Sequence, residues 1–274
     1  MFGDLGVDDL SGAIVLVVHA HPDDEVFATG AAVIAAKAAG ARTHLRIFTG
    51  GEGRDSLLTP SDLASARRAK ETRLVASAGL LGIDTWDYLT EPGRWTDTPH
   101  APARTIGAAA TADIAAPVRT ALEALCPDIV LTVGPDGLTG HPDHIACHHA
   151  VAHALATAIH RPRVALGAVL DQRSVRAAAE TARAVTGRPV GSGRVTGMAL
   201  DTSVITVTGP PGTDDRRRRA LDAYVPGLGT SNATDVDTER MGTGDSVLLR
   251  FILDTDGWTQ DHFVPLRVHA TWES

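Results

Sequence analysis

Short apolar segments alternate with helical patterns along the first 170 residues. The expected strands are short and rich in apolar or β-branched residues, and they span residues 13–18, 43–48, 85–89, 128–133 and 164–170. The helical patterns between them cover residues 26–39, 61–80 and 106–125, and a further helix begins at His141 to His144. Pro117 is expected to kink or split the third of these helices. Strand followed by helix, at least four times over, predicts an α/β fold with a Rossmann-like, mostly parallel sheet and helices on both faces.

The pattern loosens beyond residue 170. It predicts a helix over residues 172–184, a connector, a short helix over 214–223, and strands over residues 204–207, 246–253 and 263–268. We therefore expect a Rossmann-like core over residues 1–170 and a smaller, mixed carboxyl-terminal extension over residues 171–274 that completes the fold.

Charge and composition narrow the class of partner. The 274 residues include 25 Lys and Arg against 33 Asp and Glu, a net charge of −8, which argues against nucleic acid and anionic membranes as partners. The first apolar run is far shorter than the roughly 20 residues that span a bilayer, and the amino terminus lacks the basic start of a signal peptide. Cys126 and Cys147 lie in apolar stretches, so we expect buried free thiols in a cytoplasmic protein.

Two clusters of histidine and aspartate follow two of the buried strands. His19 to Glu25 reads HAHPDDE, and His141 to His144 reads HPDH. The carboxyl ends of parallel strands share one edge of a sheet, where such a fold binds its ligands. Helix-start carboxylates and surface histidines would explain one cluster alone, but two clusters converging at that edge favour a metal site. A second set of ligands, which a two-metal phosphoesterase would need, is not evident in the sequence.

Two imidazoles and one carboxylate with an open fourth position form a catalytic zinc set. Such a site lowers the pKa of bound water to about 7 and polarises a carbonyl. One carboxylate would remain as general base, and one histidine as general acid or oxyanion donor. The residues alone do not rank the four histidines as ligands or say which aspartate abstracts the proton.

Together, Ala20 to Glu25 and Gly140 to His144 resemble the LmbE-like/PIG-L family of zinc N-deacetylases, and the likeness extends over about the first 170 residues. The resemblance implies that His21, Asp24 and His144 hold one Zn²⁺ per chain, or another first-row divalent metal. It also implies that Asp23 is the general base, and that His141 stabilises the oxyanion or protonates the leaving amine. His19 lies outside the motif, and we expect it to be a packed or supporting residue.

Further likeness concerns the substrate. Thr49 to Glu52 resembles the family's second-strand loop. Gly93 to Asp97 resembles the glycine-arginine-tryptophan loop of the mycothiol-pathway N-acetylglucosaminyl-inositol deacetylases, which implies that Asp97 binds a sugar hydroxyl. Arg68 and Glu71 match an R-x-x-E pattern whose arginine contacts substrate in the family, although Arg67 competes for that role and a surface ion pair is the alternative.

Two features depart from the family or stand outside it. Tyr224 stands where these enzymes tend to carry a histidine, which indicates a different substrate wall. Arg216 to Arg219 is expected to be a solvated helix face, with binding of an anionic substrate group as the less common alternative.

These inferences predict a metal-dependent hydrolase that removes an N-acetyl or other small N-acyl group from an amino sugar, such as an N-acetylglucosamine-containing small molecule. The alternatives are an amidase of thiol conjugates, a deacetylase of an antibiotic or other secondary metabolite, and a catalytically silent carbohydrate-binding protein. The expected partner is the N-acylated amino sugar, and a homo-oligomer is compatible with the sequence.

Overall fold

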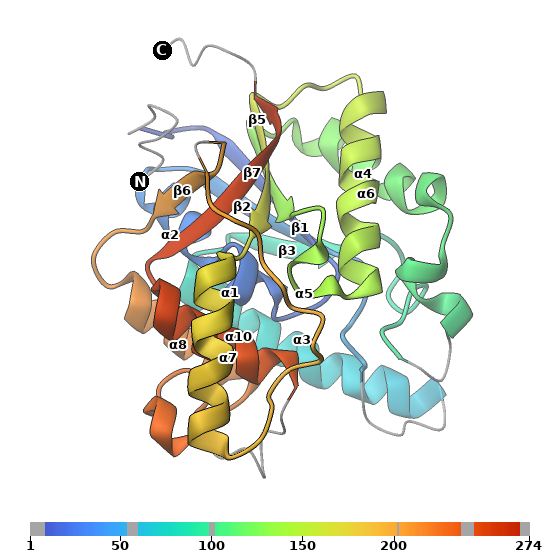
Figure 1. Ribbon diagram of the computed structural model, residues 1–274. Helices are drawn as coiled ribbons and strands as arrows, with labels where there is room; N and C mark the ends of the chain where they lie inside the picture. Colours follow the sequence, from blue (N-terminus) through green and yellow to red (C-terminus); the bar gives the residue numbers. More distant parts are fainter. Residues whose placement is uncertain (1–8, 54–59, 99–101, 202, 237–243, 269–274) are drawn as a thin grey trace.

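Seven strands form one sheet, and the computed structural model describes residues 9–53, 60–98, 102–201, 203–236 and 244–268 (Figure 1). The strands are β1 Ile14–His19, β2 Arg42–Ile47, β3 Thr85–Tyr88, β4 Ile129–Val133, β5 Val164–Val169, β6 Ile205–Thr208 and β7 Gln260–Val268. Their order is β3-β2-β1-β4-β5-β7-β6, with parallel pairing from β3 to β5 and antiparallel pairing of β7 with β5 and β6. The predicted α/β fold with a mostly parallel sheet is confirmed, and its carboxyl-terminal strands extend the same sheet.

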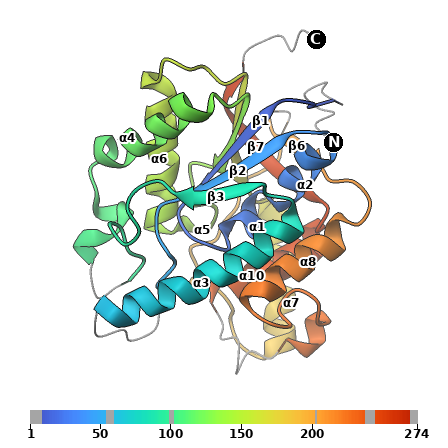
Figure 2. The same ribbon diagram turned by 180° about the vertical axis from the view of Figure 1, so that it is seen from behind.

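Helices cover both faces of the sheet (Figures 1 and 2). They are α1 Asp24–Ala28, α2 Gly30–Ala38, α3 Pro60–Leu81, α4 Thr111–Leu125, α5 Gly137–Gly140, α6 Pro142–Thr157, α7 Gln172–Thr186, α8 Thr213–Tyr224 and α10 Asp245–Asp256, with 3-10 turns at Pro102–Arg104, Ile106–Ala108 and Ala233–Asp235. Leu16 and Val18 of β1 pack toward α4 and α6, whereas Val15 and Val17 pack with the core formed by α2, α3, α8 and α10. Because both faces are covered, β1 is buried at every position after its first, and it is apolar from Ile14 to Val18.

The expected strand over residues 246–253 is wrong, because this segment lies within helix α10. Every residue from Val247 to Leu253 is buried, including Arg250. A short run that is buried on all sides carries no alternation, so hydrophobic periodicity cannot separate helix from strand there.

The single helix expected over residues 26–39 is two helices, separated at Thr29 (Figure 2). Arg217 of α8 explains the break: its Nε donates to the Val26 carbonyl at 2.7 Å and its Nη2 to the Phe27 carbonyl at 2.9 Å. In a continuous helix those carbonyls would accept from the amides four residues ahead. Gly30 leaves the room, since a Cβ there would lie 2.9 Å from Arg217 Nε.

The four arginines on α8 do not form the expected solvated face. Arg217 is fully buried and paired with Asp261 at 2.7 Å. Arg216 donates to the Leu80 carbonyl, and Arg218 donates to the Gly229 carbonyl. Only Arg219 fits the expectation, as an exposed partner of Asp215.

Two smaller expectations are corrected. Helix α4 continues across Pro117, and the break falls instead at Ala109 and Ala110, whose extended backbone separates α4 from the preceding 3-10 turn. Cys147 is buried as expected, but Cys126 is exposed, and both thiols are free. Within the described ranges, each helix is too short or too polar to cross a bilayer.

Arg217→Met should destabilise the fold by about 3–5 kcal/mol, because it leaves Asp261 buried without its partner. Arg219→Met is the matched control: it removes an exposed ion pair and should cost less than about 1 kcal/mol. Urea denaturation measures both, and equal small losses would contradict the role assigned to Arg217.

Candidate active site

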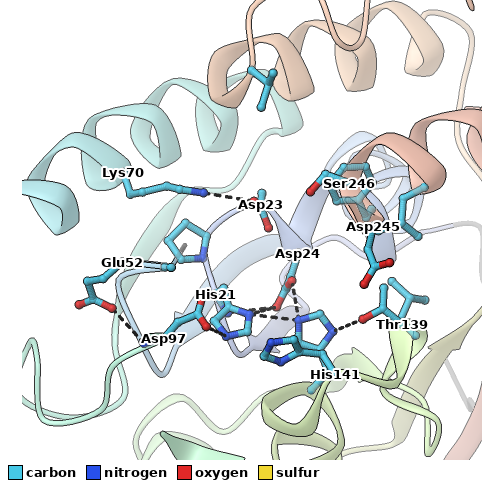
Figure 3. A pocket seen from close by; sticks show the side chains of 18 residues that line it. His21, Asp23, Asp24, Glu52, Lys70, Asp97, Thr139, His141, Asp245 and Ser246 are labelled. Carbon is cyan, nitrogen blue, oxygen red and sulfur yellow. Dashed lines mark hydrogen bonds and ion pairs between the residues drawn. The ribbon is translucent and has the colours of Figure 1, made fainter. Parts of the chain in front are cut away.

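A cavity of about 420 Å³ opens at the carboxyl ends of β1 and β4 (Figure 3). The strand order reverses between these two strands, which is where open α/β sheets bind ligands. Its walls come from the turn between β1 and α1, the loop after β2, the loop around Asp97, the segment between β4 and α6, and residues next to α8 and in α10. Both histidine clusters therefore meet there, as the sequence predicted.

His21, Asp24 and His144 lie next to one another in this cavity. His21 Nδ1 is 3.1 Å from His144 Nε2, which is in turn 3.1 Å from Asp24 Oδ1. Asp24 Oδ2 is 3.8 Å from His21 Nδ1 and also accepts the backbone N–H groups of Ala20 and His21. All three side chains are buried.

Hydrogen bonds behind the two imidazoles fix their orientation. His144 Nδ1 donates to the Gly137 carbonyl at 2.9 Å, and His21 Nε2 donates to Asp143 Oδ2 at 3.3 Å. Asp143 is held in turn by the N–H of Gly107 at 2.8 Å. The ring nitrogens that face each other are then His21 Nδ1 and His144 Nε2, and two lone pairs at that distance require positive charge between them.

The donor set fits a first-row divalent cation. With bonds of about 2.0–2.1 Å, tetrahedral ligand atoms lie roughly 3.3 Å apart, close to the spacing of these three groups. Two further donor groups have atoms within 4.8 Å of one another: His21, His141 and His144, and His21, Asp97 and Asp143. The geometry thus offers Asp24 or His141 as the third ligand beside the two histidines.

Burial and neighbouring charges shift the pKa values of the site residues in opposite directions. Burial lowers the pKa of His21, but the carboxylates of Asp97, Asp143 and Asp24 outweigh it and raise this pKa to about 10. Burial likewise raises the pKa of Asp24, but His144 and His21 reverse the effect and hold it well below its usual range. A metal ion would therefore displace a proton from His21.

Asp23 projects from the same turn toward Lys70 of α3 (Figure 3). Lys70 Nζ lies 3.3 Å from Asp23 Oδ2. Burial raises the pKa of Asp23, and the Lys70 ammonium opposes that rise. A carboxylate at the cavity wall, with a cation beside it and with Asp24 next to it in sequence, is suited to accept a proton from water.

His141 caps α6 and lines the cavity. Its Nδ1 accepts the N–H of Asp143 at 3.2 Å, so the neutral ring carries its proton on Nε2. Burial lowers the pKa of His141, and the neighbouring His21 and His144 lower it further. At pH 7 this neutral imidazole is therefore better suited to donate a hydrogen bond to an oxyanion than to act as a general acid.

Asp97 lines the cavity, and its loop is bonded to the loop after β2. Its Oδ1 lies 3.8 Å from His21 Nε2, and its N–H donates to Glu52 Oε2 at 3.2 Å. Glu52 Oε1 accepts from Arg67 Nε at 2.9 Å. Arg67 lies against Gly93, where a Cβ would collide with its guanidinium. Glu52 therefore holds the Thr49 to Glu52 loop to the Gly93 to Asp97 loop, and Arg67 of α3 pairs with it.

The structure does not bring Arg68 into this group. Arg68 is exposed and donates to Ser65 at 3.0 Å, while Glu71 accepts from Tyr88. Arg67 and Lys70, three residues apart on one face of α3, point to the site instead. Sequence reasoning missed Lys70, whose spacing from Arg67 was the available signal.

Three further residues singled out by the sequence, His19, Tyr224 and Asp143, lie around the donor set and are not part of it. His19 is buried and pairs with Thr29 at 3.0 Å, outside the donor set. Tyr224 is buried behind Asp23, and its neighbour Val225 lines the cavity. Asp143, which the motif contained, supports His21.

Comparison with known proteins identifies relatives of the amino-terminal part. The family model described as PIG-L, GlcNAc-PI de-N-acetylase, matches residues 16–155. A Mycolicibacterium vanbaalenii protein named 1D-myo-inositol 2-acetamido-2-deoxy-alpha-D-glucopyranoside deacetylase is 35% identical over 155 residues, 53% of this chain and 55% of that protein. The chain thus spans about half the length of this curated relative.

Two further matches extend into the carboxyl-terminal part. A Corynebacterium glutamicum protein of the same name is 34% identical over 211 residues, covering 73% of this chain and 70% of that protein. The crystal structure of a triple mutant of a deacetylase of the teicoplanin biosynthetic pathway, Orf2*T, has a TM-score of 0.57 at 16% identity and covers 92% of this chain and 97% of its own. The structural likeness shows the shared fold, and the sequence matches show that the chain belongs to the PIG-L family.

Proposed function

We propose that this protein is a metal-dependent hydrolase that removes an N-acetyl or other small N-acyl group from an amino sugar. The observation that carries the proposal is the convergence of His21, Asp24 and His144 beside the carboxylate of Asp23 in one cavity. The names of the Mycolicibacterium and Corynebacterium relatives, both deacetylases of an acetamido sugar, agree with it.

His21, Asp24 and His144 would hold the metal, for which their nitrogen and oxygen donors favour Zn²⁺ or a first-row neighbour. When bound, such an ion polarises the amide carbonyl and lowers the pKa of a water molecule. In this proposal Asp23 accepts the proton of the attacking water. His141 donates its Nε2–H to the oxygen that becomes negatively charged. Asp23 then returns the proton to the amine nitrogen as the C–N bond breaks.

Asp97 would accept hydrogen bonds from sugar hydroxyls while the acylated nitrogen faces the metal side. Asp97 lines the cavity, and Glu52 accepts its backbone N–H. Val225, Ser246 and Leu249 line the cavity as well, so we propose that the carboxyl-terminal extension forms part of the substrate wall. That wall contains Val225 where the sequence had pointed to Tyr224.

One alternative has a specific observation in its favour. A cavity of about 420 Å³ lies within the range of about 300–1,000 Å³ for drug-sized ligands, so it has room for more than one sugar ring. A deacetylase of a larger secondary metabolite would use the same residues, and the teicoplanin-pathway deacetylase shares the fold. We also propose that the protein acts in the cytoplasm.

Asp23→Asn should retain the metal but deacetylate N-acetyl amino sugars roughly 10²–10⁴-fold more slowly, because an amide cannot accept the proton of water. Mass spectrometry of a substrate panel measures loss of the acetyl group, and elemental analysis measures the metal. His144→Ala is the comparison variant and should lose the metal itself. Full activity in Asp23→Asn would exclude Asp23 as the base, and a wild-type protein inactive on the whole panel would exclude the proposed function.

Asp97→Ala should lower kcat/KM on an N-acetyl amino sugar at least about tenfold, since a charge-assisted hydrogen bond contributes about 1.5–3 kcal/mol. Metal content should not change, and a minimal amide without a sugar ring should be hydrolysed as before, if it is a substrate. Asp113→Ala, at an exposed position on α4, is the matched control. Equal losses on the sugar and the minimal amide would contradict a sugar-binding role.

A further inference from the structure

The proposed general base has an unusual backbone conformation. Asp23 has φ 100° and ψ −23°, in the left-handed region that favours glycine. A non-glycine residue stays in such a conformation only where its surroundings hold it, and residues of this kind cluster at functional sites. The contacts that hold Asp23 are therefore part of the site.

Glu25 is the first of these contacts. Its Oε2 accepts the N–H of Asp23 at 2.9 Å, and its side chain is completely buried. Oε1 accepts two hydroxyl groups from distant parts of the chain: Ser77 of α3 at 2.7 Å and Tyr224 of α8 at 2.7 Å. Glu25 is thus fixed by two helices, α3 and α8, that supply none of the candidate metal ligands His21, Asp24 and His144.

Lys70 is the second contact, and it also lies on Tyr224. Its ammonium pairs with Asp23 Oδ2 at 3.3 Å and stands 5.5 Å from the centroid of the Tyr224 ring. An ammonium at that distance from an aromatic face is attracted by the ring. Tyr224 therefore contacts both groups that hold Asp23. Its hydroxyl donates to Glu25, and its ring lies against the Lys70 ammonium.

We propose that Tyr224 is a positioning residue, which holds Asp23 in its left-handed conformation through Glu25 and Lys70. The role rests on the proposed function of Asp23 as general base. Tyr224 is only 2% exposed and is not among the residues that line the cavity, so it acts without touching the substrate. A phenol suits this place because it combines a hydroxyl donor for a carboxylate with an aromatic face for an ammonium.

The two functions of the phenol can be separated by substitution. Tyr224→Phe keeps the ring and removes the donor to Glu25, and Tyr224→Leu removes both. Ser77→Ala removes the other donor to the same oxygen and leaves Tyr224 intact. Tyr88→Phe is the matched control, because the Tyr88 hydroxyl bonds to Glu71 on the outer part of α3.

Steady-state kinetics on an N-acetyl amino sugar should show kcat falling about tenfold to a hundredfold in Tyr224→Phe, since misplacing a catalytic group by about 1 Å costs that much. Tyr224→Leu should lose more and Ser77→Ala a comparable amount, whereas KM and metal content stay at wild-type values. In an Asp23→Asn background, Tyr224→Phe should cause no further loss, because both changes act on one step. Tyr88→Phe should match the wild type.

Additive losses in that double-mutant cycle, or a loss of metal in Tyr224→Phe and Ser77→Ala, would overturn the proposal. A crystal structure of metal-loaded Tyr224→Phe gives a readout that needs no turnover. It should show Asp23 displaced from its left-handed conformation, and an unchanged Asp23 would also overturn the proposal. If the wild type deacetylates nothing in the panel, the proposed function fails, while this structure still decides the role of Tyr224.

Discussion

Two imidazole nitrogens that face each other at the carboxyl ends of β1 and β4 are the constraint on which this site depends. His21 Nδ1 and His144 Nε2 lie 3.1 Å apart, and Asp143 and the Gly137 carbonyl fix the opposite nitrogens as donors. Burying such groups costs free energy unless a cation or a proton lies between them. Asp24 supplies the negative charge that makes a cation favourable there, and Asp23 and His141 are placed around it.

The rest of the fold holds the loops that carry these groups. Glu52 joins the loop after β2 to α3 through its ion pair with Arg67, and to the loop of Asp97 by accepting the Asp97 N–H. On the other side of the first cluster, Arg217 draws the carbonyls of Val26 and Phe27 out of the helix that begins at Asp24. A helix that could have run on unbroken from Asp24 is therefore short and anchored to α8, which links the metal-binding turn to the carboxyl-terminal part of the chain.

Sequence reasoning located the site because its groups are local to strand ends. A motif after a buried strand, at a shared sheet edge, places His21 and His144 without knowledge of packing. It did not find the partners, because these are set by contacts across the fold. Arg67 and Arg68 differ by about 100° around α3, so choosing Arg68 in place of Arg67 replaced the partner of Glu52 with an exposed side chain. The helix α10 was missed because burial on all sides removes the periodic signal. The contacts of Arg217 were missed because they are set by packing across the fold.

The central claim is that His21, Asp24 and His144 hold one metal ion. Anomalous diffraction, collected on crystals of the metal-loaded protein above and below the absorption edge of the metal, tests it most directly. The account predicts one peak about 2.0–2.2 Å from His21 Nδ1, His144 Nε2 and an Asp24 oxygen. A peak that His21 shares with Asp97 and Asp143, a peak with His141 in place of Asp24, or no peak in this cavity would contradict it.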